Sequence, residues 1–161
     1  MKPVFLHLLF FFGISADYTV VRQTYLKAVN SEADALQLEK LTQPQSSADA
    51  VMQAYYGSAL ALKAKYSINP YNKVVHVRSG STQLNAAVNK FPQHTEIRFL
   101  RYSVEYNTPS MVGISTHLSE DKTFIMAHPP MRAHALFQTI KGFMLQVTGL
   151  TEAEKKQIQS W

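Results

Sequence analysis

The residues best suited to chemistry lie together in one short stretch, 95–110, with the sequence TEIRFLRYSVEYNTPS. Arg98 and Arg101 are three residues apart, so they share one face if the stretch is helical. Two guanidinium groups on one face can hold a carboxylate or a phosphate through paired hydrogen bonds. One hypothesis is therefore an anion-binding site formed by these arginines and the neighbouring Tyr102.

The same arginines have candidate partners elsewhere in the chain. Glu120 and Asp121 follow in the segment EDKTFI, and a helix–turn–helix return can bring them to the arginines. Glu105, four residues after Arg101, can form a further ion pair along the helix. Burying a charge without a partner costs several kcal/mol, so a covered arginine needs a carboxylate from the chain. We expect these pairs to be structural, and the anion site is the alternative.

A second candidate surface is basic. The span between Asp49 and Glu96 contains no acidic residue, and three of its lysines cluster around a predicted turn: Lys63, Lys65 and Lys73. Such a cluster is typical of an ordinary solvated surface, but it could also contact anionic lipid or an acidic patch on a partner. The net charge of +5 is not concentrated into a basic arm, so we expect no nucleic-acid partner.

Motifs for catalysis or cofactor binding are missing from the sequence. There is no cysteine, no H-E-x-x-H, no G-x-S-x-G and no phosphate-binding glycine loop. A zinc site would have to assemble from histidines that are scattered along the chain: His76, His94, His117, His128 and His134. We expect no catalytic residue, no metal and no cofactor.

Helical periodicity predicts the elements that must position these residues. The longest predicted helices span 48–66 and 71–90, separated by the turn signal at 69–70, and the next spans 95–106. Shorter helical segments are predicted within 19–30, 31–41, 109–128, 132–149 and 151–161. Short turns between helices favour antiparallel neighbours, so the sequence predicts an all-α bundle of antiparallel helix pairs.

Small residues in the two long helices resemble those of a tetratricopeptide repeat. The second helix follows the order small, large, small and terminating proline at Gly80, Leu84, Ala87 and Pro92. Gly57 and Leu60 resemble the matching positions of the first helix, although the separation from Gly57 to Gly80 is longer than the repeat allows. The resemblance implies a tetratricopeptide-like bundle whose long helices approach each other through Gly57 and Gly80.

Three segments carry a second resemblance: NPYNK at 69–73, EIRFLRYSVEYNTPS at 96–110 and EDKTFI at 120–125. Together they resemble an uncharacterised family of small exported all-helical proteins from Bacteroidota. The resemblance covers most of the chain after residue 16. It implies an all-α fold and a location in the cell envelope, and it implies no activity.

The N-terminus is typical of a secretory signal peptide. Residues 1–16, MKPVFLHLLFFFGISA, have a positive charge, an apolar run and then small residues. The run is shorter than the roughly 20 residues that cross a bilayer. We expect cleavage after Ala16 and a single helical domain, 17–161, in the periplasm without a transmembrane segment. The full chain of 161 residues is 46% hydrophobic and 17% charged, which is typical of a folded domain.

These observations predict an exported, non-enzymatic helical module that binds a protein or peptide in the cell envelope. Folds built of helix pairs present grooves suited to extended or helical segments. One alternative is an enzyme of unrecognised type, including one whose metal is held by the C-terminal histidines. Another is a protein that contacts an anionic membrane surface through its lysines.

Overall fold

The structure is a computed structural model that describes residues 17–161, and the expected signal peptide lies outside the described residues. Within this range the prediction of an all-α bundle is confirmed, because the chain forms eight α-helices, two short 3-10 helices and no strand. The α-helices are α1 (Tyr18–Ala28), α2 (Glu32–Thr42), α3 (Ala50–Tyr66), α4 (Pro70–Lys90), α5 (Thr95–Tyr106), α6 (Leu118–Ala127), α7 (Phe137–Gln146) and α8 (Glu152–Ser160); the 3-10 helices are η1 (Gln43–Gln45) and η2 (Ser110–Val112). None of these helices combines the length and the apolar character needed to cross a membrane.

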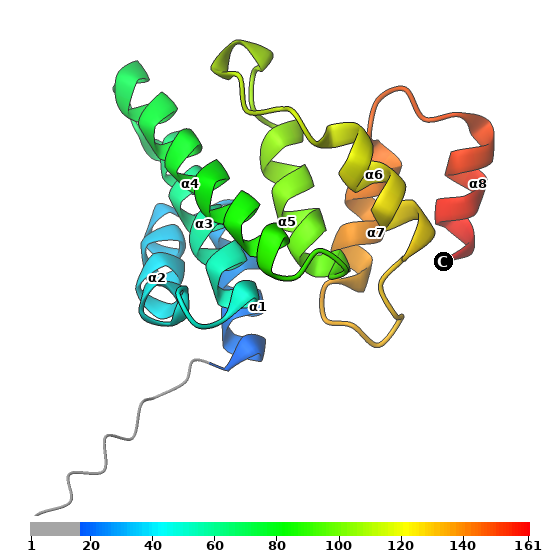
Figure 1. Cartoon of the computed structure of the whole chain (residues 1–161), viewed down its shortest axis with the longest axis horizontal. Coiled ribbons are helices and arrows are strands. Elements are labelled where there is room, and N and C mark those ends of the chain that lie inside the picture. Colours follow the sequence, from blue (N-terminus) through cyan, green and yellow to red (C-terminus); the bar gives the residue numbers. More distant parts are fainter. Residues whose placement is uncertain (1–16) are drawn as a thin grey trace, which may run out of the picture.

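Helices α3 and α4 form a long antiparallel pair (Figure 1). Asn69 caps α4 by accepting a 2.9 Å hydrogen bond from the backbone N–H of Tyr71, and Pro70 occupies the first turn, where its fixed φ suits a helix. The two helices come into close contact at Gly57 and Gly80. A Cβ atom at Gly80 would lie 2.5 Å from the carbonyl oxygen of Gly57, so the predicted contact between these glycines is present and has no room for a side chain.

Helix α5 lies in the middle of the bundle. It packs against α3 and α4 on one side and against α6 on the other, while α1 and α2 pack on α3 and α7 lies beside α8 (Figure 1). Nine of its twelve residues are buried, including four charged ones: Glu96, Arg98, Arg101 and Glu105. Because burying an unpaired charge is costly, the position of this helix requires partners from neighbouring elements.

Candidate functional site

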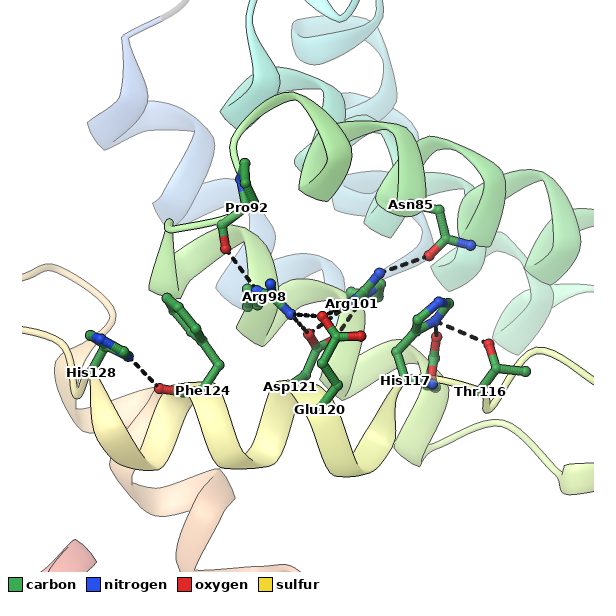
Figure 2. A network of polar contacts seen from close by, with 11 residues as sticks. Asn85, Pro92, Arg98, Arg101, Thr116, His117, Glu120, Asp121, Phe124 and His128 are labelled. Atoms are coloured by element: carbon green, nitrogen blue, oxygen red, sulfur yellow. Dashed lines mark hydrogen bonds and ion pairs between the residues drawn. The ribbon is translucent and has the colours of Figure 1, made fainter.

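The two arginines of α5 meet a buried carboxylate of α6 (Figure 2). Asp121 has no exposed surface and accepts hydrogen bonds from Arg101 Nε and Nη2, both at 2.7 Å, and from Arg98 Nη1 at 2.9 Å. Glu120 is more than half exposed; it also binds Arg98 and lies 3.7 Å from Arg101 Nη2. Two cations therefore face two carboxylates, and we call these four residues the Asp121 cluster.

Two further guanidinium nitrogens of the Asp121 cluster also have partners within the protein. Arg98 Nε donates to the carbonyl oxygen of Pro92 at 2.8 Å, and Arg101 Nη1 donates to Asn85 Oδ1 at 3.2 Å (Figure 2). The guanidinium of Arg98 lies 4.7 Å from the centre of the Phe124 ring, a cation–π contact. An external anion would have to displace Asp121 in order to use both arginines.

Tyr102, the third residue of the predicted anion site, is part of the aromatic core. Its ring lies 6.0 Å from the ring of Phe143 and 5.9 Å from that of Tyr106, and it is 2% exposed. Burial raises the pKa of Tyr102 to about 12. The hydroxyl group is therefore neutral at neutral pH, and the side chain contributes packing at this position.

Glu105 does not pair with Arg101, contrary to the sequence-based prediction. Its carboxylate accepts a 2.8 Å hydrogen bond from the backbone N–H of His117 and lies 2.7 Å from His117 Nδ1. Arg101 turns toward α6 because Asp121 and Asn85 together use all of its guanidinium nitrogens. The contact with His117 fixes the chain where it enters α6.

A third buried carboxylate, Glu96, connects distant parts of the chain and was not predicted as a site residue. Arg22 of α1 holds it with two hydrogen bonds, from Nε at 2.7 Å and Nη2 at 2.8 Å, and Tyr55 of α3 donates its hydroxyl proton. His134, which precedes α7, lies 3.3 Å from the same carboxylate. Arg22 and Glu96 are 74 residues apart, and no local spacing in the sequence relates them.

The Glu96 carboxylate should make stability depend on acidic pH. Burial raises the pKa of Glu96, but the hydrogen bonds from Arg22 and Tyr55, together with the charges of Arg22 and His134, hold it below its ordinary value of 4.5. A carboxylate with a lowered folded-state pKa contributes stability that is complete above the unfolded-state pKa and is lost as pH falls through the folded value. We therefore expect the free energy of unfolding to fall as pH drops below about 4.5.

Urea unfolding followed by circular dichroism over an acidic pH series measures this loss. Glu96→Gln keeps the shape of the side chain and removes its titration, so the variant should be less stable at neutral pH and lose less on acidification. If the free energy of unfolding of Glu96→Gln fell as steeply at acidic pH as that of the wild type, the assignment of this loss to Glu96 would be contradicted.

An apolar groove with a volume of about 770 Å³ lies beside the turn between α3 and α4. Its sides come from α1, α3, α4 and the segment around η2, and Phe99 of α5 and Phe143 of α7 reach it from the core. The volume falls in the range of roughly 300–1,000 Å³ that is typical of ligand sites. Among the described residues, the charged side chains that line the groove are Lys65 and Lys73, with no carboxylate.

The three predicted lysines therefore divide between two places. Lys63 binds Glu39 of α2 at 3.0 Å and does not line the groove. Lys65 lines the groove and donates to the backbone carbonyl oxygen of Val29. Lys73 is exposed at the groove, and its ammonium group makes no hydrogen bond or ion pair with residues 17–161.

The C-terminal histidines have separate environments. His117 faces Glu105, His134 faces Glu96, and His128 lies 3.1 Å from the carbonyl oxygen of Phe124. Within residues 17–161, no three acidic or histidine side chains come together in a way that could hold a metal ion.

Comparison of the chain with protein-family models, curated proteins and solved structures found no match. The structure defines the class: an all-α bundle with a charge-balanced cluster around the buried Asp121 and an apolar groove in which the charged lining groups, among the described residues, are lysines. The groove is the candidate functional site.

Proposed function

We propose that the chain is an exported, non-enzymatic binding module that holds an apolar segment of a protein or peptide partner in its groove. The observation that carries the proposal is the groove itself, with a volume of about 770 Å³ and a largely apolar lining. Exposed apolar surface is costly in water, and a contiguous concave patch of this kind is typical of a binding site.

The helix pair that forms one side of the groove supports a partner of this kind. Helices α3 and α4 are fixed against each other at Gly57 and Gly80, which gives the groove a rigid wall. Rigid helix pairs are the unit that tetratricopeptide-like proteins use to bind peptides, and we extend that resemblance to this pair. Export to the periplasm, expected from the N-terminal sequence, would place the groove among proteins of the cell envelope.

Two adjacent valines of α4 provide a matched test. Val74 lines the groove, whereas Val75 does not and is 41% exposed. Val74→Trp should obstruct part of the groove and weaken peptide binding about tenfold, a change of roughly 1.4 kcal/mol. Val75→Trp adds the same indole to the same helix and should leave the dissociation constant unchanged.

The probe is a set of leucine-rich peptides selected from a display library against the wild-type protein, with dissociation constants measured by fluorescence anisotropy. Thermal unfolding of each variant verifies that it is folded. A selection without enrichment over an unrelated helical protein, or equal weakening by both tryptophan substitutions, would refute the groove as a peptide site.

A second candidate function is contact with an anionic membrane surface. The turn between α3 and α4 exposes Ile68 at 96% and Tyr71 at 75%, close in sequence to Lys73. Apolar and aromatic side chains beside lysines suit the boundary between headgroups and acyl chains. Two results together would favour this function. The selection would yield no peptide, and wild type and Val74→Trp would sediment equally strongly with phosphatidylserine vesicles.

A further inference from the structure

We infer that the groove selects apolar peptide segments that carry a carboxylate at one end, and that Lys73 contacts this carboxylate. This inference rests on the proposed function and adds the charge of the ligand and its direction in the groove. The occupant is thus a peptide with leucine-like side chains followed by aspartate, glutamate or a free C-terminus.

Charge complementarity carries the first step. Lys65 and Lys73 both lie at the end of the groove formed by the turn between α3 and α4, and the lining contains no carboxylate that could neutralise them. The ammonium group of Lys65 is already bound to the carbonyl oxygen of Val29. Lys73 has no such partner within the described residues, so it is the cation available to a ligand.

The polar groups of the lining favour a peptide over an alkyl chain. Ser58, Ser103 and Thr108 each donate the hydroxyl proton to a carbonyl oxygen of their own helix region, at 3.0, 2.9 and 2.7 Å. Ser58 and Ser103 are buried, whereas Thr108 is half-buried and Asn107 is exposed. The hydroxyl oxygen of Thr108 and the side-chain carbonyl oxygen of Asn107 keep acceptor capacity. A fatty acid would cover these acceptors without supplying a donor, whereas a peptide brings backbone N–H groups.

A charge reversal tests the inference. Peptides from the selection described above are compared in matched forms that have an amidated C-terminus and end in glutamate, glutamine or lysine. For the wild type, the glutamate form should bind most tightly. Lys73→Glu should weaken the glutamate form about tenfold and strengthen the lysine form, because like charges repel and unlike charges attract at the rim.

Lys40→Glu is the control, because Lys40 is an exposed lysine of α2 outside the groove and its replacement changes the net charge by the same amount. It should leave the order of the three peptides unchanged. Three forms that bind with equal affinity, or an equal response to Lys73→Glu and Lys40→Glu, would overturn the inference while leaving the groove a peptide site.

A palmitate competition provides the last arm. Palmitate offers the same carboxylate on an alkyl chain and should displace the selected peptides poorly. Displacement of the peptide by palmitate at lower concentration than by the unlabelled peptide would assign the groove to a lipid carboxylate and overturn the inference. If no peptide is selected at all, the proposed function itself fails, and the two failures are thereby distinguished.

Discussion

Asp121→Ala is expected to lower the free energy of unfolding by about 3–5 kcal/mol, because it leaves buried arginines without their shared partner. Arg98 and Arg101 are 9% and 4% exposed at their side chains, and the half-exposed Glu120 cannot replace three hydrogen bonds to a fully buried carboxylate. Urea unfolding followed by circular dichroism measures the loss.

A double-mutant cycle separates a structural role of the Asp121 cluster from an anion-binding role. If the cluster is structural, Arg101→Ala should cost less in the Asp121→Ala background than in the wild type, since the shared interaction is already lost. Lys155→Ala is the control, because Lys155 and Glu152 form an exposed ion pair whose loss should cost less than about 1 kcal/mol. Additive losses for Arg101 and Asp121 would contradict the structural role and favour an anion site at the arginines.

Gly80→Ala is expected to destabilise the protein by about 1–3 kcal/mol, although alanine is ordinarily the better helix former. The added Cβ would lie 2.5 Å from the carbonyl oxygen of Gly57 and 2.9 Å from the backbone nitrogen of Ala61. Both neighbours are backbone atoms, so relief requires α3 and α4 to move apart. The same substitution should also alter the groove, since both helices line it.

Gly142→Ala is the matched control for this prediction. Gly142 also lies inside a helix, α7, but a Cβ there would meet no atom within 4 Å. Alanine at this position should stabilise the protein by roughly 0.5–1 kcal/mol through reduced backbone entropy of the unfolded chain. Equal effects of the two substitutions, with the same sign, would show that α3 and α4 are not held at the glycine contact.

Helices were predictable because their signals are local. The predicted helix 95–106 coincides with α5, and 48–66 and 71–90 differ from α3 and α4 by at most two residues at their starts. Apolar periodicity, the Asn69 cap and Pro70 all act within a few residues of the boundaries they set. The Gly57–Gly80 contact was also predictable, since small residues in neighbouring antiparallel helices indicate close approach.

The charged contacts of α5 were only partly predictable, because they depend on how helices pack. The contact of Arg98 and Arg101 with Asp121 follows from types and order of residues along the chain. Glu105 was expected to form an ion pair with Arg101 within its own helix. Instead, Arg101 binds Asp121 of α6, and Glu105 binds His117.

The Glu96 contacts had no signal in the sequence, and the groove had only one. Arg22 and Tyr55 lie 74 and 41 residues before Glu96 along the chain, and no helical or strand periodicity relates such distant positions. The groove is lined by residues of α1, α3, α4, α5 and α7. The sequence pattern of each helix alone is typical of ordinary core and surface positions. The lysine cluster was the one visible trace, since Lys65 and Lys73 were both singled out by the missing acidic residues around them.

The most direct measurement of the central claim is a nuclear magnetic resonance titration of the folded chain with a selected leucine-rich peptide that ends in glutamate. Amide shifts should concentrate on residues that line the groove, such as Val74, Val77 and Val104, and should be lost in Val74→Trp but kept in Val75→Trp. Shifts centred on Arg98, Arg101 and the start of α6, with the groove unchanged, would contradict the account and place ligand binding at the arginines.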